Sequence, residues 1–263
     1  MTEPQNPLLR DDIIPGVVRL TFNRPDKLNA LSTPMLAQLS AELEQIRTDK
    51  SVRCVVLAGA GGKAFVAGAD IAEYQGGKSA AFNAYQMESR CIFDALESLP
   101  KPTIALVDGF ALGGGFEIAL CCDTIICSTN ARFGLPEGRL GLSPGGGGTQ
   151  RLVRAVGKYV ASDVMLSGWR LTGERAHALG LAAECIASDA LEETLLARLR
   201  AILKTAPLAQ AEMKRLIREG ADAPLTSAKS YEQEVLFRLY MTRDGQEGID
   251  AFLEKREPDF KGE

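Results

Sequence analysis

Two glutamates in the middle of the chain are the residues best suited to chemistry. Glu117 lies in an apolar segment directly after the glycine run 113–115, and Glu137 follows in a Pro-Glu-Gly loop. A carboxylate among apolar neighbours needs a reason, because burying a charge costs free energy unless the charge is paired or neutralised. Carboxyl groups with shifted pKa values act as general acids and bases. The two residues therefore predict proton transfer to or from a substrate.

Two glycine turns supply candidate backbone donors beside these glutamates. The run 113–115 opens a short apolar helix, so its N–H groups are unpaired at the positive end of the helix dipole. The turn 68–70 follows the apolar segment 54–58 and offers a second donor. Together, two such donors and two carboxylates could polarise a carbonyl group and move protons beside it. Taken alone, the glycine run is better explained as a tight strand-to-helix turn.

Composition and charge narrow the class of protein. The chain has 263 residues, of which 46% are hydrophobic and 24% charged, and its net charge is −4. This charge argues against a nucleic-acid partner, and no apolar run approaches the roughly 20 residues that span a bilayer. The N-terminal segment lacks the basic and apolar regions of an export signal. The six cysteines form no CxxC pair, so we expect reduced thiols in a cytoplasmic protein.

Other catalytic classes fit the sequence poorly. His177 is the only histidine, and the helical pattern around it indicates a surface residue, so no metal site is expected. Ser143 has the spacing of a hydrolase nucleophile, but the next residue, Pro144, has no N–H to donate to an oxyanion. No glycine fingerprint for a dinucleotide follows a strand in the required context.

The hydrophobic pattern predicts an α/β part to about residue 190, followed by a helical tail. Strand and helix signals recur as strand–strand–helix about three times before residue 130, which favours stacked ββα turns over simple βαβ alternation. We therefore divide the chain into residues 1–190 and 191–263. The predicted strands are 17–22, 54–58, 103–107, 124–127 and 181–186. The predicted helices are 34–48, 79–99, 149–156, 161–166, 173–179, 190–204, 208–219, 225–241 and 244–255.

Five segments of the chain follow one another in a recognisable order: NRPDKLNALS at 23–32, AFVAGADIAEY at 64–74, residues 101–151, LTGERAHALGL at 171–181 and AFLEKREPDFKG at 251–262. Together they closely resemble the crotonase family, the enoyl-CoA hydratase/isomerase superfamily. The resemblance covers nearly the whole chain and implies a crotonase-type spiral of ββα units. It also implies that the C-terminal helices build a homotrimer, commonly paired into a homohexamer.

The resemblance implies a role for each of the two glutamates and each of the two backbone donors. The carbonyl oxygen of a coenzyme A thioester would lie between the N–H groups of Ala69 and Gly114. Hydratases of this family carry glutamates at the positions of Glu117 and Glu137, and both are present. The implied reaction adds water to a trans-2-enoyl-CoA to give a 3-hydroxyacyl-CoA. Glu137 would give a proton to the α-carbon and Glu117 would activate the water, with no metal or redox cofactor.

The resemblance also implies contacts with the coenzyme A part of the substrate. Residues matching the family's motifs for these contacts are Lys27, Ala67, Asp70, Ile71 and Ala72, and Lys255 would reach a phosphate from the C-terminal tail.

Three positions depart from the family pattern and leave the rate and the preferred acyl chain open. Ala72 replaces a frequent lysine, Leu135 a frequent glutamine, and Gly138 a branched apolar residue. Another crotonase reaction, such as double-bond isomerisation or a specialised dehydration, stays an alternative. A thioester-binding protein without activity is a second alternative, against which the paired glutamates argue.

Overall fold

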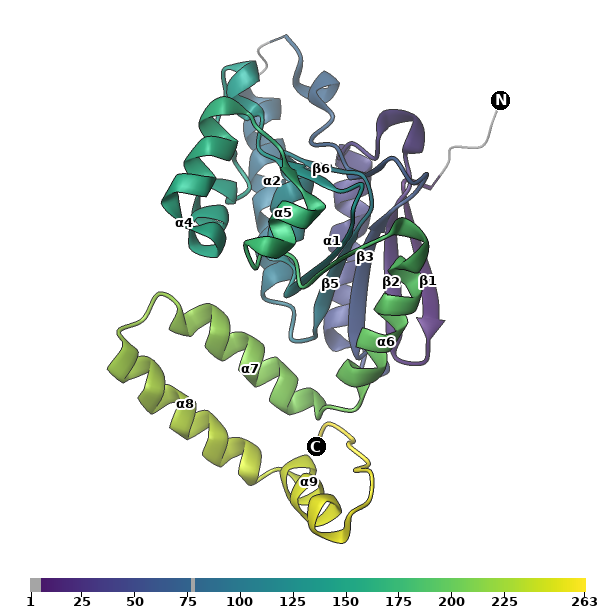
Figure 1. The fold of residues 1–263 in the computed structure, drawn as a ribbon, viewed down its shortest axis with the longest axis vertical. Coiled ribbons are helices and arrows are strands. Elements are labelled where there is room, and N and C mark those ends of the chain that lie inside the picture. Colours follow the sequence, from purple (N-terminus) through teal and green to yellow (C-terminus); the bar gives the residue numbers. More distant parts are fainter. Residues whose placement is uncertain (1–5, 77–78) are drawn as a thin grey trace.

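The computed structural model describes residues 6–76 and 79–263, whose strands form two sheets (Figure 1). The larger sheet has six strands in the order β1-β2-β3-β5-β7-β10. The β1–β2 pair is antiparallel and all other neighbours in this sheet are parallel. Its strands are β1 (Leu8–Ile14), β2 (Val17–Phe22), β3 (Cys54–Gly59), β5 (Thr103–Val107), β7 (Thr124–Ser128) and β10 (Glu184–Ile186).

The smaller sheet has four short strands in the order β4-β6-β8-β9, of which the first three are parallel. They are β4 (Ala64–Val66), β6 (Phe110–Leu112), β8 (Arg132–Gly134) and β9 (Leu171–Thr172). Each of the first three directly follows a strand of the larger sheet and precedes a helix. The units are thus β3–β4–α2, β5–β6–α3 and β7–β8–α4, with α2 (Ser79–Glu97), α3 (Gly114–Cys121) and α4 (Gly148–Ser167). The predicted spiral of ββα units is confirmed.

The first turn of the spiral is simpler than the others. After β2, the chain forms the 3₁₀ helix η1 (Pro25–Lys27) and then the helix α1 (Thr33–Thr48). A single parallel bridge between Leu31 and Ala69 stands where the other units have a second strand. This bridge fixes the segment that follows β4.

The central strands β3, β5 and β7 of the larger sheet are buried on both faces, as expected for strands that read as continuous apolar runs. The helix α6 (Leu191–Leu203) covers one face and packs against alternate strand residues such as Val56 and Ile104. On the opposite face, residues such as Leu57 and Val107 belong to a larger core that includes α1 and α2. Figure 1 shows α1 and α6 on opposite sides of the strands.

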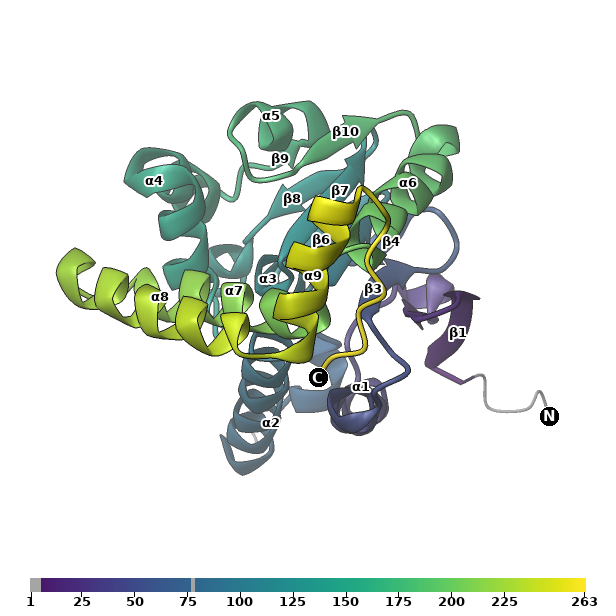
Figure 2. The same cartoon turned by 90° about the horizontal axis from the view of Figure 1, so that it is seen from below.

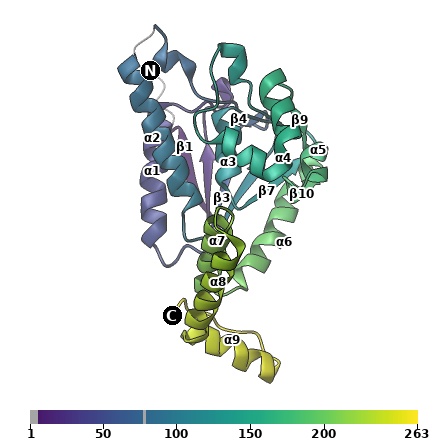
Figure 3. The same cartoon turned by 90° about the vertical axis from the view of Figure 1, so that its left-hand side faces the viewer.

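The last helices extend away from the sheets. Figures 1 and 3 show α7 (Pro207–Gly220), α8 (Leu225–Tyr240) and α9 (Arg243–Glu254) below the strands, and Figure 2 shows them from below. The C-terminal segment returns to α9, because the buried carboxylate of Asp244 accepts hydrogen bonds from the backbone N–H groups of Lys261 and Gly262. The predicted helices of the tail are confirmed. The division at residue 190 stays a prediction, since α6 still packs on the sheet.

Some local predictions were incomplete. The two helices expected at 149–156 and 161–166 belong to one element, α4, interrupted at Gly157, where φ is 79° and ψ is 165°. The strands β1, β4, β6, β8 and β9 were not predicted. The last four have only two or three residues each and so show no periodicity, whereas β1 carries three consecutive charged residues instead of an alternating pattern. Among the described residues, no helix combines the length and the apolar character needed to cross a bilayer.

Candidate active site

One cleft brings the predicted central residues together. It has a volume of about 570 Å³, and its wall includes Glu117, Glu137, Ala69 and Gly114. Three of its segments follow β4, β6 and β8, so the cleft lies at the carboxyl edge of the small parallel sheet. The rest of the wall comes from α2 and from the loop before α4. The short strands missed in the sequence are therefore the elements that position the site.

Glu117 is buried in the first turn of α3, with 4% of its surface exposed. Its Oε1 atom accepts hydrogen bonds from the N–H groups of Gly146 and Gly148, both 2.8 Å away. Burial raises the pKa of Glu117, while these two bonds and the charge of Arg151 act in the opposite direction. No hydrogen bond from a described residue reaches Oε2. One oxygen is thus held by the protein and the other is left for a ligand.

Glycine is required around Glu117 because the chain approaches the carboxylate closely. A Cβ atom on Gly146 would overlap the ring of Phe93 and lie 2.7 Å from Oε2 of Glu117. A Cβ atom on Gly148 would lie 3.0 Å from Oε1 of Glu117. Any side chain at these positions would displace the carboxylate or the loop.

Glu137 begins the 3₁₀ helix η3 (Glu137–Leu140), rather than lying in an open loop. Its Oε2 atom is buried and has no hydrogen-bond partner among the described residues. Burial raises the pKa of Glu137 to about 7, and the charge of Glu117 adds a smaller increase. A buried polar atom without a partner is unusual in a native structure and is frequently functional. Glu137 is thus suited to carry a proton near neutral pH.

Two backbone N–H groups complete the arrangement. Gly114 is the first residue of α3, so its N–H has no acceptor within the helix. Ala69 lies between two residues that bond to Leu31: Leu31 donates to the carbonyl of Gly68 at 2.9 Å, and Asp70 donates to the carbonyl of Leu31 at 2.8 Å. Within the described parts of the chain, neither Ala69 nor Gly114 donates to a recorded acceptor. This arrangement is typical of an oxyanion hole.

The two donors are neighbours in space. A Cβ atom on Gly114 would lie 4.0 Å from the backbone nitrogen of Ala69 and 3.1 Å from the side chain of Leu31. Glu137 also lies close, because a Cβ atom on Gly113 would be 3.2 Å from its Oε1 atom. A carbonyl oxygen bound by both N–H groups would therefore have Glu137 beside it.

Of the residues predicted to bind coenzyme A, some line the cleft and others do not. Ala67 and Ile71 line the cleft. Asp70 lies between them, and its carboxylate forms a 2.9 Å ion pair with Arg24, so it holds the loop that carries Ala69. Arg24 was not singled out in the sequence, although it belongs to the motif at 23–32.

The other predicted coenzyme A residues do not line the cleft. Lys27 lies exposed on η1, and Ala72 lies exposed on η2 (Ile71–Tyr74). Lys255 directly follows α9, and Figure 3 shows α9 at the end of the molecule away from α3.

The single histidine lies outside this cleft. His177 is exposed on α5 (Gly173–Ala178), as predicted, with Nδ1 3.0 Å from the carbonyl oxygen of Ala182. Within residues 6–76 and 79–263, no group of three or more His, Cys, Asp or Glu side chains could hold a metal ion. Ser143 lines the cleft, but His177 does not, so no histidine base accompanies that hydroxyl.

The spiral and its cleft define a class of protein, and comparison with known proteins agrees. The model of the enoyl-CoA hydratase/isomerase family matches residues 12–263, and the chain belongs to this family. The chain is 41% identical to the 2,3-dehydroadipyl-CoA hydratase of Escherichia coli (strain K12), over 94% of this chain and 95% of that protein. It is 39% identical to the short-chain-enoyl-CoA hydratase of Clostridium acetobutylicum, over 91% and 92%.

A solved structure has the same fold. The crystal structure of the enoyl-CoA hydratase from Bacillus anthracis superimposes with a TM-score of 0.94 at 36% identity, covering 98% of this chain and 100% of that chain. The predicted fold class and family are thus confirmed.

Proposed function

We propose that this enzyme is an enoyl-CoA hydratase that adds water to a trans-2-enoyl-CoA to give a 3-hydroxyacyl-CoA. One observation carries this proposal: two carboxyl groups with raised pKa values line the same cleft as two N–H groups that have no acceptor among the described residues. Relatives named as hydratases of CoA esters support the same reaction class.

Different environments assign different roles to the two glutamates. Two N–H donors stabilise the ionised form of Glu117, whereas Oε2 of Glu137 has no donor among the described residues. Two neighbouring carboxyl groups that share protons divide into an acid and a base according to such differences. Glu117 is therefore the base, and Glu137, with a pKa of about 7, is the acid.

The reaction follows from these roles. The thioester oxygen accepts hydrogen bonds from Ala69 and Gly114, which stabilise the negative charge that develops as water attacks. Glu117 takes a proton from the water through its free oxygen while the water oxygen bonds to the β-carbon. The electrons of the double bond form an enolate, and Glu137 gives its proton to the α-carbon. Glu117 is then protonated and Glu137 ionised, so one proton must return between them before the next cycle.

The coenzyme A part of the substrate would lie over the loop after β4. Ala67 and Ile71 line the cleft there, and we retain Asp70, Ala72 and Lys27 as proposed contacts around its mouth. Lys255 does not line its own cleft, so its contact with coenzyme A would be made in the cleft of a neighbouring copy. The N–H donors activate the thioester, so we propose that the reaction uses no metal or redox cofactor.

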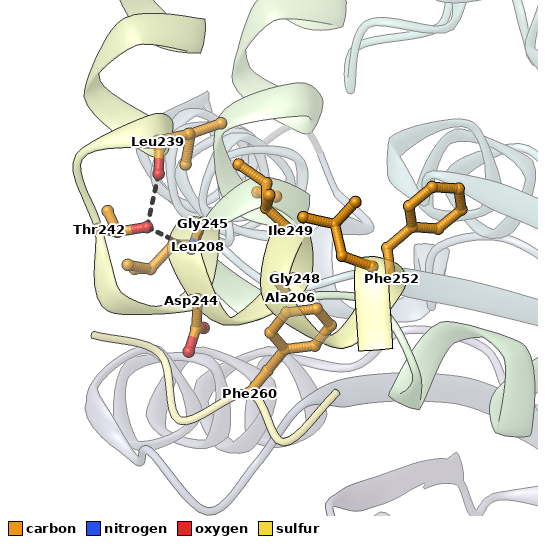
Figure 4. Close-up of a pocket in the computed structure, with 12 residues that line it drawn as sticks. Ala206, Leu208, Leu239, Thr242, Asp244, Gly245, Gly248, Ile249, Phe252 and Phe260 are labelled. Atoms are coloured by element: carbon orange, nitrogen blue, oxygen red, sulfur yellow. Dashed lines mark hydrogen bonds between the residues drawn. The ribbon is translucent and has the colours of Figure 1, made fainter. Parts of the chain in front are cut away.

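We further propose that the chain forms a homotrimer or a homohexamer. The tail exposes large apolar side chains, including Leu236, Tyr240 and Phe252 with exposed fractions of 59%, 51% and 82%. An apolar hollow at α9 has a volume of about 460 Å³. Figure 4 shows Phe260 at this hollow, beside Gly248. Contiguous apolar surface of this kind is unusual on a monomer. Light scattering that finds a stable monomer at micromolar concentration would contradict this proposal.

The location proposed for the enzyme is the cytoplasm. All six cysteines are free thiols, which suits a reducing compartment.

A direct assay of the purified protein on crotonyl-CoA tests the reaction. We expect conversion to 3-hydroxybutyryl-CoA, which is monitored as the loss of enoyl absorbance. A panel of 2-enoyl-CoA esters from short to long would then define the preferred acyl chain. A shift of the double bond without addition of water would instead indicate an isomerase. Binding of every ester without turnover would indicate a thioester-binding protein.

A further inference from the structure

Arg151 forms a closed network behind the candidate active site. Its guanidinium donates to both carboxylate oxygens of Glu97, at 2.9 and 2.7 Å, and to Asp94 at 3.3 Å. Its Nη1 atom also donates to the carbonyl oxygen of Gly146 at 2.7 Å. The side chain is only 16% exposed. A bidentate ion pair of this kind fixes the plane of the guanidinium.

The loop that Arg151 holds is the loop that binds Glu117. The carbonyl of Gly146 faces Arg151, whereas its N–H donates to Oε1 of Glu117. Gly147, with φ of +96°, turns the chain over the guanidinium, so that a Cβ atom there would overlap Nη1. The N–H of Gly148 then reaches the same Oε1 atom. The loop thus connects the arginine to the carboxylate through one peptide turn.

We propose that Arg151 is a positioning residue that fixes Glu117 for catalysis through this glycine loop. By holding the carbonyl of Gly146, Arg151 orients the N–H groups of Gly146 and Gly148 toward Oε1 of Glu117. The Oε2 atom of Glu117 then stays available to the cleft. Arg151 does not line the cleft itself, so it acts without touching the substrate. The inference rests on the proposed function only in taking Glu117 as the catalytic base.

Replacing the arginine should lower turnover more than substrate binding. Loss of the guanidinium frees the Gly146 carbonyl, and a misplacement of about 1 Å in a catalytic group can cost about 10²-fold in rate. For Arg151→Gln we expect kcat on crotonyl-CoA to fall about 10- to 100-fold. KM should change less than about threefold, because Ala69 and Gly114 bind the thioester. Arg151→Lys keeps the charge and one donor, so it should recover part of the loss.

Arg154 provides a matched control on the same helix. It forms an ion pair with Asp222 at 3.2 Å, its side chain is 55% exposed, and it does not line the cleft. Arg154→Gln should therefore leave kcat within about twofold of the wild-type value. Equal losses in Arg151→Gln and Arg154→Gln would overturn the proposal.

A double-mutant cycle separates positioning from a general effect on the fold. If Arg151 acts through Glu117, adding Arg151→Gln to a Glu117→Gln enzyme should lower kcat by less than about threefold. A purely structural role would give the same loss in both backgrounds, and that result would contradict the proposal. If Arg151→Gln does not fold, kcat is measured in Glu97→Gln and Arg151→Lys instead. A wild-type kcat in both variants would overturn the proposal that Arg151 positions Glu117.

Hydrogen–deuterium exchange makes the test independent of the reaction. We expect faster exchange in residues 145–150 of Arg151→Gln than in the wild type or Arg154→Gln, because the N–H groups of Gly146 and Gly148 lose their fixed acceptor. Unchanged exchange there would overturn the positioning role. If the wild type hydrates no enoyl-CoA ester, the proposed function fails, and the exchange measurement alone decides whether Arg151 holds the loop.

Discussion

The two walls of the cleft present the same side chain in opposite ways. On one wall, Glu117 belongs to a helix, accepts two backbone hydrogen bonds and is 4% exposed. On the other wall, Glu137 begins a single 3₁₀ turn, and its buried Oε2 atom has no partner among the described residues. The first wall stabilises a carboxylate and the second stabilises a carboxylic acid. Burial alone would raise both pKa values, so the hydrogen bonds are what distinguish base from acid.

The packing of the two walls differs in the same direction. Gly146 beside Glu117 has no room for a Cβ atom, whereas a Cβ atom on Gly138 beside Glu137 would meet nothing closer than 3.7 Å. The Glu117 wall is therefore rigid and the Glu137 wall has space. Position 138, where glycine departs from the family pattern, could hold a larger residue, because its φ does not lie in the left-handed region.

The largest expected effect lies between the walls, at the shared oxyanion donor. Gly114→Pro removes the N–H, and losing one such donor typically costs about 10²–10³-fold in kcat. Gly114→Ala is the control, because it keeps the N–H while meeting the same Leu31 side chain at 3.1 Å. Steady-state kinetics on crotonyl-CoA should show the large loss for proline alone. A folded Gly114→Pro enzyme with near wild-type turnover would exclude this N–H as the donor.

Removing either carboxyl group should be nearly as damaging. Glu117→Gln and Glu137→Gln keep the shape of the side chain but end its proton transfer, so each should lower crotonyl-CoA hydration by at least about a hundredfold. Substrate binding should change little, as measured by KM or by binding of a saturated acyl-CoA. The double variant should fall well short of the product of the two losses, because both groups act on one transition state. More than about a tenth of wild-type rate in either single variant would refute the two-glutamate account.

A smaller effect should distinguish the rigid wall from the open one. Gly146→Ala brings a methyl group against Phe93 and Glu117, so we expect about a tenfold loss of kcat and a destabilisation of about 1–3 kcal/mol. Gly138→Ala meets no such obstacle and should change the free energy of unfolding by less than about 0.5 kcal/mol. Kinetics and denaturant unfolding on both variants would check this contrast. Equal changes of kcat and of the free energy of unfolding in the two variants would mean that both walls accommodate a methyl group equally well.

The smallest effect concerns stability against pH. In the folded protein the pKa of Glu137 is about 7, against about 4.3 for an ordinary glutamate in the unfolded chain. The folded state therefore binds more protons between these values, so this contribution to stability is complete below about pH 4.3 and is lost as the pH rises through about 7. Glu137→Gln has no carboxyl group to ionise, so the variant does not lose this stability as the pH rises. Its thermal midpoint should therefore improve relative to wild type from pH 5 to pH 8, and a constant difference would contradict the raised pKa.

The sequence was sufficient for the two glutamates, because each stands in a motif whose spacing is local. The long helices were also predictable, since an apolar stripe such as that of α1 repeats over four turns. The hydrogen-bond partners of Glu117 were not predictable from spacing, because Gly146 and Gly148 reach it only after the chain has formed the next two strands, β7 and β8. The run of glycines from 145 to 148 was the available signal for such an approach.

Other features depend on contacts that local patterns do not encode. The strands of the small sheet are too short for a period, and Arg24 and Arg151 acquire their roles only through tertiary ion pairs with Asp70 and Glu97. Lys255 was predicted to reach coenzyme A, and within one chain it does not line the cleft. That prediction depends on assembly and not on the fold of a single copy.

Exchange of the α-protons of butyryl-CoA in deuterated water tests the division of roles most directly. This saturated ester has no double bond to hydrate, so enzyme-catalysed exchange reports proton transfer at the α-carbon alone. Assigning that transfer to Glu137 predicts that Glu137→Gln lowers the exchange rate at least about a hundredfold, while Glu117→Gln keeps it within about tenfold of wild type. Exchange that survives in Glu137→Gln and disappears in Glu117→Gln would contradict the assignment of acid and base.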